Sequence, residues 1–295
     1  MHGAHERIAS KVDWVVVTDL DGTLLDHHTY SYGPAQSALQ RLAEAGIPLV
    51  LNTSKTRPEL AVLRKELGNQ DPFIVENGSA VFVPEARFVD ADTRAFLARE
   101  CAAEADHAES DGALACKVFG RDYQAIVSWL QQRRKRYRFE AFSDYSVADL
   151  CARTGLPEAQ ARLALAREFS EPLLWQDSPA ALQQFERELA AAGYGILRGG
   201  RFLHILGECD KGQSMAWLRR CYAVAWGRQP RVVALGDSHN DVAMLEAADI
   251  AVLVRSPKHE APIVAPAGEL IVSEQEGPRG WGEVIHSLLD RMMQQ

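Results

Sequence analysis

Residues 14–23 have the sequence WVVVTDLDGT, in which a short apolar run ends abruptly at two aspartates. Such a run of β-branched and aromatic side chains is typical of a parallel strand that is covered on both faces. Asp19 and Asp21 follow it, and Gly22 permits a turn conformation that other residues resist. Because open α/β sheets bind ligands beyond the carboxyl ends of their strands, this stretch predicts both the fold class and the place of a polar site.

Strand and helix patterns alternate on both sides of a long middle segment. Several expected helices start at a proline or end at a glycine, and the expected strands are short apolar runs. This alternation predicts an α/β protein with a Rossmann-like, doubly wound parallel sheet. In chain order we expect a helix at 34–45, a strand at 47–51, a helix at 58–67, a strand at 73–75, a helix at 211–226, a strand at 232–235, a helix at 240–247 and a strand at 250–254.

The middle segment has a different sequence pattern, in which Ala-rich helical stretches alternate with short strand-like pieces such as 116–119 and 173–175. A chain of 295 residues exceeds the usual size of one domain, which leaves room for a second. We therefore expect a core domain whose two segments, 1–84 and 203–295, flank an inserted α+β cap domain at 85–202.

Composition and charge narrow the class of protein. The 32 Lys and Arg against 40 Asp and Glu give a net charge of −8, which disfavours a nucleic-acid partner. We interpret the basic run at 133–138 as a solvated helix end. The N-terminus is polar, and no stretch approaches the length of a membrane span, so we expect a cytoplasmic protein without a membrane partner. Five scattered cysteines and the adjacent His27 and His28 suggest neither a disulfide framework nor a zinc site.

Polar residues also follow the other expected core strands. Thr53, Ser54 and Lys55 come after the second strand, although Thr53 alone could equally be a helix N-cap. Lys211 is the first residue of an expected helix, a position where the helix dipole disfavours a cation. Its placement there therefore indicates a nearby anion. A further group, which follows the strand at 232–235, consists of Asp237, Ser238, Asn240 and Asp241, with Ser238 interpreted as a cap.

In this order and spacing, Asp19 with Asp21, Thr53, Lys211, and Asp237 with Asp241 resemble the four motifs of the haloacid dehalogenase superfamily of phosphatases. The insert between Thr53 and Lys211 resembles the cap domains of that superfamily. A finer resemblance, to the mannosyl-3-phosphoglycerate phosphatase family, is carried by LNTSKT at 51–56, ENG at 76–78, AREFSEP at 166–172, GGRF at 199–202 and GPRGW at 277–281.

The superfamily resemblance implies a mechanism. Asp19 would attack phosphorus as the nucleophile, and Asp21 would act as general acid and base. Thr53 and Lys211 would contact the phosphoryl oxygens. Mg²⁺ is the implied cofactor, because hard oxygen ligands suit it and two carboxylates beside a phosphate need a cation. Its expected ligands are Asp19, the backbone carbonyl of Asp21 and Asp237, with Asp241 orienting a metal-bound water or the Lys211 ammonium.

The finer resemblance implies hydrolysis of mannosyl-3-phosphoglycerate, a small phosphorylated sugar-glycerate. Arg167 is expected to meet the glycerate carboxylate, and Ser170 and Glu171 the sugar hydroxyls. The other expected substrate-binding residues are Ser54, Lys55, Arg201, His204 and Asn240.

Three alternatives remain open from the sequence, together with the oligomeric state. The first is a related phosphatase acting on glucosyl-3-phosphoglycerate or sucrose phosphate. The second is a phosphomutase of the same superfamily, which would return the phosphoryl group to its substrate. The third is a sugar-phosphate-binding regulator, although a pure binder would need neither a nucleophile nor a proton shuttle.

Overall fold

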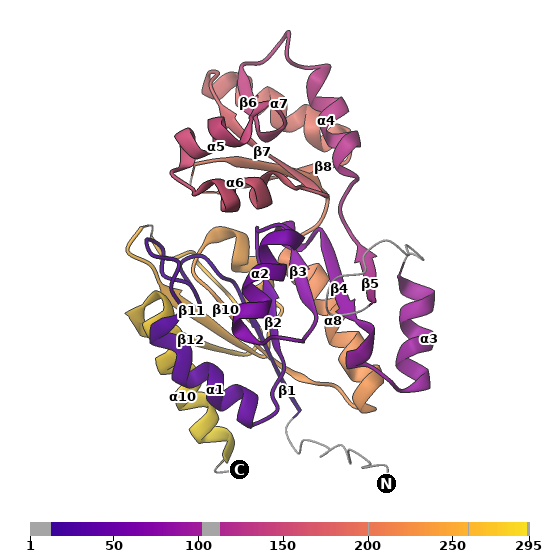
Figure 1. Cartoon of the computed structure of the whole chain (residues 1–295), viewed down its shortest axis with the longest axis vertical. Helices are drawn as coiled ribbons and strands as arrows, with labels where there is room; N and C mark the ends of the chain where they lie inside the picture. Colours follow the sequence, from indigo (N-terminus) through magenta and orange to yellow (C-terminus); the bar gives the residue numbers. More distant parts are fainter. Residues whose placement is uncertain (1–12, 102–112, 200, 259, 294–295) are drawn as a thin grey trace.

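The computed structural model describes residues 13–101, 113–199, 201–258 and 260–293. The described chain forms an eight-stranded sheet and a four-stranded sheet, each with its own helices. In Figure 1 the smaller sheet and its helices lie above the larger sheet. The polar N-terminus and Gly200 of the GGRF motif lie outside the described residues.

The large sheet confirms the doubly wound α/β prediction. Its strand order is β12-β11-β10-β1-β2-β3-β4-β5, and the neighbours from β12 to β3 are parallel. The chain moves outward from β1 in both directions, so a topological switch point lies between β1 and β10. The strands are β1 (Trp14–Thr18), β2 (Leu49–Asn52), β3 (Phe73–Val75), β4 (Ala80–Pro84), β5 (Leu114–Val118), β10 (Arg231–Gly236), β11 (Ile250–Arg255) and β12 (Glu269–Glu276).

Helices cover both faces of this sheet, which explains the uninterrupted apolar run in β1. Val16 packs with Leu42 and Leu288 on one face, whereas Val15 and Val17 face the opposite cluster. The first face is covered by α1 (Gln36–Glu44), α2 (Arg57–Leu67) and α10 (Gly277–Met293), and the second by α3 (Ala91–Glu100), α8 (Lys211–Trp226) and α9 (Val242–Glu246).

The expected helix limits are reproduced closely. The N-cap of α2 is Thr56, which forms a capping box with Glu59, and Gly68 ends the helix in the left-handed conformation. Thr53 is therefore not the N-cap of this helix. Short 3₁₀ turns join the longer elements: η1 (Gly33–Ala35), η2 (Glu76–Gly78), η3 (Glu85–Arg87), η4 (Phe142–Asp144) and η5 (His239–Asp241).

The strand-like piece expected at 116–119 belongs to the large sheet and not to the cap. β5 pairs antiparallel with β4, and its Leu114 and Cys116 enter the core of the large sheet. The preceding α3 packs on α8, with Phe96 against Trp217. Local composition could not reveal this, because the partners of β5 and α3 lie elsewhere in the chain.

The small sheet forms the centre of the cap. Its antiparallel order is β6-β7-β9-β8. The expected boundary at 84/85 would assign β5 to the cap, although it belongs to the large sheet. The expected boundary at 202/203 would assign β9 to the core, although it belongs to the small sheet. We therefore propose that the cap spans about 120–207. The cap elements are β6 (Phe139–Ala141), β7 (Ser170–Trp175), β8 (Tyr194–Arg198), β9 (Leu203–Gly207), α4 (Tyr123–Gln131), α5 (Val147–Thr154), α6 (Glu158–Leu165) and α7 (Pro179–Ala191).

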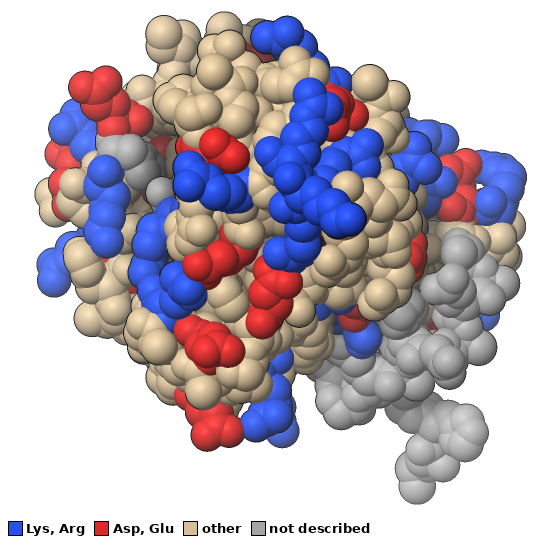
Figure 2. Space-filling model, turned by 90° about the horizontal axis from the view of Figure 1, so that it is seen from above, with Lys and Arg blue, Asp and Glu red and all other residues tan. Residues whose placement is uncertain are grey.

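Four of the five basic side chains in the run at 133–138, which follows α4, form ion pairs within the cap. Arg134 contacts Asp144 at 2.5 Å, and Arg136 contacts Glu188 at 2.5 Å. In Figure 2, which shows the molecule from above, basic side chains gather on part of the face, and acidic side chains lie among and below them. None of the helices in the described part of the chain is both long enough and apolar enough to cross a bilayer.

Candidate active site

The loop after β1 places Asp19 at the switch point of the large sheet. The Asp19 amide donates to the Leu235 carbonyl at 2.9 Å, which ties the end of β1 to β10. Gly22 adopts φ of +87°. A Cβ atom at that position would lie 2.6 Å from the Asp237 Oδ2 atom. The turn therefore requires glycine for both reasons, and it brings the Asp19 loop against the loop after β10.

Lys211 lies at the centre of the buried charges. Its Nζ donates to Asp19 Oδ1 at 2.6 Å and to Asp241 Oδ1 at 2.7 Å. The other Asp241 oxygen accepts from the backbone amides of Asp237 and Ser238, at 3.1 Å each. Both oxygens of Asp241 thus hold protein donors. The expected contact between Asp241 and the Lys211 ammonium is thus present.

Three carboxylates meet here around a single ammonium. Asp19, Asp237 and Asp241 each offer an oxygen within 4.8 Å of the others. Burial, reinforced by Asp241 and Asp21 but opposed by Lys211, raises the pKa of Asp19 to about 7. Burial together with Asp19 and Asp241 raises the pKa of Asp237 to about 8. This excess of buried negative charge and hard oxygen donors fits a divalent cation such as Mg²⁺.

The loop after β2 approaches the same site. Thr53 is fully buried, and its amide donates to the Ile74 carbonyl at 3.1 Å. Lys55 forms an ion pair with Asp21, with 2.9 Å between Nζ and Oδ2, and lies over the Tyr30 ring. Burial opposes the charge on Lys55, but Asp21 and Glu59 raise its pKa above the usual value. Nothing in the sequence indicated that Lys55 would pair with Asp21, the expected general acid.

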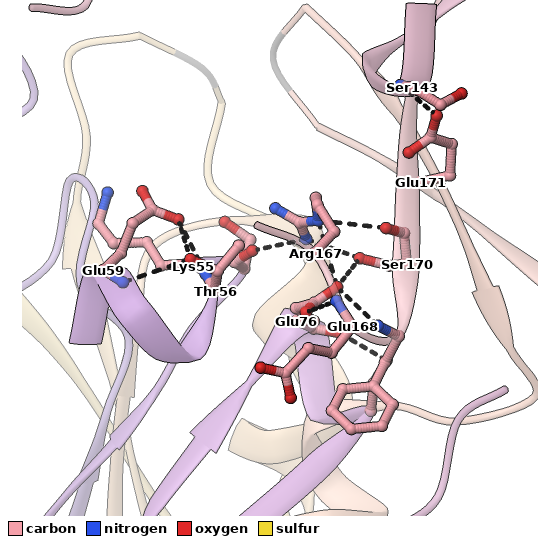
Figure 3. A network of polar contacts seen from close by, with 12 residues as sticks. Lys55, Thr56, Glu59, Glu76, Ser143, Arg167, Glu168, Ser170 and Glu171 are labelled. Carbon is pink, nitrogen blue, oxygen red and sulfur yellow. Dashed lines mark hydrogen bonds and ion pairs between the residues drawn. The ribbon is translucent and has the colours of Figure 1, made fainter. Parts of the chain in front are cut away.

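Two of the expected cap residues reach the core, as Figure 3 shows. Arg167 Nη2 donates to the Ser54 carbonyl at 3.1 Å and to Ser170 Oγ at 2.6 Å. Both Arg167 and Ser170 also contact Glu76, at 3.2 and 2.7 Å. In the sequence, Glu76 stands out only as part of the ENG motif at 76–78, which assigns it no role of its own. The sequence signal that could have singled it out is its position directly after the expected strand at 73–75.

The remaining expected substrate-binding residues do not form one group but lie in different parts of the cap and the core. Glu171 accepts from the Ser143 amide at 2.7 Å within the cap, and burial raises its pKa. Burial lowers the pKa of His204 to about 3, so its imidazole is neutral at pH 7. Arg201 is exposed and donates to the carbonyls of Arg153 and Thr154, at 2.8 and 3.3 Å. Asn240 joins the core instead, through Asn77 at 3.0 Å.

The chain is similar to known proteins in sequence and in fold. A family model described as haloacid dehalogenase-like hydrolase matches residues 16–128, and one described as sucrose-6F-phosphate phosphohydrolase matches residues 174–276. A phosphatase of the haloalkanoate (HAD) enzyme superfamily from Bacteroides thetaiotaomicron superposes with a TM-score of 0.60 at 16% identity, covering 98% of this chain and 100% of that one. Sucrose-phosphatase from Synechocystis superposes with a TM-score of 0.57 at 15% identity, covering 95% and 98%.

The family model, together with two relatives that match nearly the whole chain, shows a phosphatase of the haloacid dehalogenase superfamily. A glucosyl-3-phosphoglycerate/mannosyl-3-phosphoglycerate phosphatase from Persephonella marina is 35% identical over 94% of this chain and 98% of its own length. The phosphatase of the same name from Methanococcoides burtonii is 36% identical over 94% and 97%. The chain belongs to this family of glucosyl-3-phosphoglycerate/mannosyl-3-phosphoglycerate phosphatases.

Proposed function

We propose that this protein is a magnesium-dependent phosphatase that hydrolyses mannosyl-3-phosphoglycerate to mannosylglycerate and phosphate. The observation that carries the reaction type is the buried group of Asp19, Lys211, Asp237 and Asp241 at the switch point of the sheet. Support for the substrate comes from the two relatives, which match nearly the whole chain. Their names join the glucosyl and mannosyl compounds, so the glucosyl compound is the second candidate.

Asp19 begins the reaction as the nucleophile. Its carboxylate oxygen attacks phosphorus, the bond between phosphorus and the glycerate oxygen breaks, and Asp21 gives a proton to that leaving oxygen. Lys211, 2.6 Å from Asp19, orients the carboxylate and offsets negative charge, while the Thr53 hydroxyl donates to a phosphoryl oxygen. The products of this half-reaction are mannosylglycerate and an aspartyl-phosphate at Asp19.

Water completes the reaction by attacking the same phosphorus. Asp21, now a carboxylate, takes a proton from the attacking water, and the acyl-phosphate bond breaks to release phosphate and free Asp19. Asp19, the backbone carbonyl of Asp21 and Asp237 would hold Mg²⁺, whose charge offsets that of the carboxylates and the phosphoryl oxygens. Asp241, with both oxygens engaged, holds Lys211 and the start of the loop after Gly236 in place.

The cap provides recognition of the group that carries the phosphate. Arg167 meets the glycerate carboxylate, because a guanidinium forms strong, charge-assisted hydrogen bonds with a carboxylate. Its contact with the Ser54 carbonyl brings the guanidinium next to Thr53 and Lys55. The sugar hydroxyls are left to Glu171 and His204 on the strands β7 and β9, because the Ser170 hydroxyl is buried between Glu76 and Arg167.

Product analysis tests the reaction. With mannosyl-3-phosphoglycerate and Mg²⁺, we expect free phosphate and mannosylglycerate in equal amounts. A chelator should stop phosphate release, and added Mg²⁺ should restore it. Isomerised sugar phosphate without free phosphate would replace the proposal by a phosphomutase. Binding without turnover would point to a regulator.

A further inference from the structure

The Glu76 carboxylate is a junction between the core and the cap. It is fully buried at the end of β3, yet all of its hydrogen-bond donors belong to the cap segment 167–170. One oxygen accepts from the Glu168 amide at 2.9 Å. The other accepts from the Phe169 amide at 3.2 Å, Ser170 Oγ at 2.7 Å and Arg167 Nε at 3.2 Å. A core carboxylate thus holds this short cap segment through four donors.

Arg167 is held along one edge of its guanidinium. Nε donates to Glu76 and the Ser170 carbonyl, and Nη2 donates to Ser54 and Ser170 Oγ. The side chain is only 4% exposed. Among the described residues, the structure gives Nη1 no hydrogen-bond acceptor. One edge of the guanidinium is therefore fixed by the protein, and the other nitrogen can meet an anionic ligand.

The backbone around Glu76 explains why this carboxylate is so well fixed. Glu76 and Asn77 both adopt left-handed conformations, with φ of +49° and +60°, which side chains rarely accept. Their amides donate to the Lys55 carbonyl at 3.0 Å and the Thr53 carbonyl at 2.8 Å. A Cβ at Gly78 would lie 2.2 Å from the Asp210 carbonyl oxygen, next to Lys211. This strained turn is thus anchored to the loops that carry Thr53 and Lys211.

We propose that Glu76 is a positioning residue for substrate selection. It fixes the Arg167 guanidinium beside the Thr53–Lys55 loop, so that the Nη1 side meets the glycerate carboxylate in a set position relative to Asp19. The inference rests on the proposed function, because it takes the carboxylate contact of Arg167 from there. It assigns Glu76 no contact with the substrate and no part in moving protons.

A second contact between core and cap supplies a matched control. Arg57, at the start of α2, forms an ion pair with Glu168 at 2.9 Å, and both side chains are about one-fifth exposed. This pair involves the residue next to Arg167 in the sequence but does not contact its guanidinium. Arg57→Gln therefore weakens attachment of the cap without releasing Arg167.

The experiment measures kcat and KM for mannosyl-3-phosphoglycerate and for para-nitrophenyl phosphate, which has no carboxylate. For Arg167→Ala and for Glu76→Gln we expect kcat/KM on the first substrate to fall by roughly thirty-fold or more, mainly through KM, with little change on the second. The double variant should lose no more than Arg167→Ala alone, since both changes remove one contact. Arg57→Gln should leave the ratio between the two substrates unchanged.

Ser170→Ala guards against loss of folding, because it removes the hydroxyl between Glu76 and Arg167 without leaving either charge unpaired. Ser170→Ala should lower kcat/KM for mannosyl-3-phosphoglycerate relative to kcat/KM for para-nitrophenyl phosphate, by a smaller factor than Glu76→Gln does. If Arg167→Ala changes the ratio but Glu76→Gln and Ser170→Ala do not, the positioning role is overturned and the proposed function stands. If Arg167→Ala lowers kcat/KM equally for both substrates, the carboxylate contact in the proposed function fails, and the inference fails with it.

Discussion

Asp19→Asn abolishes phosphate release, with an expected fall in kcat of at least about four orders of magnitude. The amide keeps the shape of the carboxylate and can still accept from Lys211, which lies 2.6 Å away in the parent protein. It lacks the negative charge needed to attack phosphorus, and it is a poor ligand for Mg²⁺. The measurement is steady-state phosphate release from mannosyl-3-phosphoglycerate, alongside thermal unfolding.

Asp90→Asn is the matched control for that change. Asp90 caps α3, where its side chain accepts from the Thr93 amide at 2.7 Å, and Asn is nearly as good a cap. We expect activity and stability close to those of the parent. Phosphate release by Asp19→Asn within tenfold of the parent, at an unchanged unfolding temperature, would exclude Asp19 as the nucleophile.

Asp21→Ala separates the two half-reactions. On mannosyl-3-phosphoglycerate we expect kcat to fall by about 10²- to 10⁴-fold, because the leaving glycerate oxygen then receives no proton. Para-nitrophenolate leaves without a proton, so Asp19 is still phosphorylated by para-nitrophenyl phosphate. Only the attack of water is then slow. The variant should therefore show a burst of nitrophenolate equal to one per active site, followed by slow release.

The control for the burst is Asp19→Asn, which should show none. A linear time course at the parent's rate would mean that Asp21 does not act on the attacking water.

The Lys55 ion pair gives a further comparison, since Lys55→Met removes the partner of Asp21 but leaves the carboxylate in place. That variant should retain turnover of para-nitrophenyl phosphate without a burst.

The site at the switch point could be predicted from the sequence because strand ends converge by topology alone. Asp19 and Asp237 are separated by more than two hundred residues in sequence, but β1 and β10 are parallel neighbours, so their following loops meet. Thr53 joins them for the same reason, after β2. The alternation of strands and helices was enough to place these side chains.

The contacts between core and cap could not be predicted in this way. Glu76 and Arg167 are 91 residues apart, and no strand pairing fixes their approach. The position of β5 was missed for a related reason, because five residues with a mixed pattern are compatible with either sheet. The loops after β1 and β2 are neighbours by topology, but which of their side chains pair, such as Lys55 with Asp21, requires the folded structure.

The most direct test of the account is the ratio of kcat/KM values for hexosyl-3-phosphoglycerates and sucrose 6-phosphate, measured with purified protein and Mg²⁺. The family relatives and the placement of Arg167 predict that mannosyl-3-phosphoglycerate or glucosyl-3-phosphoglycerate exceeds sucrose 6-phosphate by about a hundredfold or more. The glycerate carboxylate is the group that sucrose 6-phosphate lacks. An equal or higher value for sucrose 6-phosphate would contradict the proposed function.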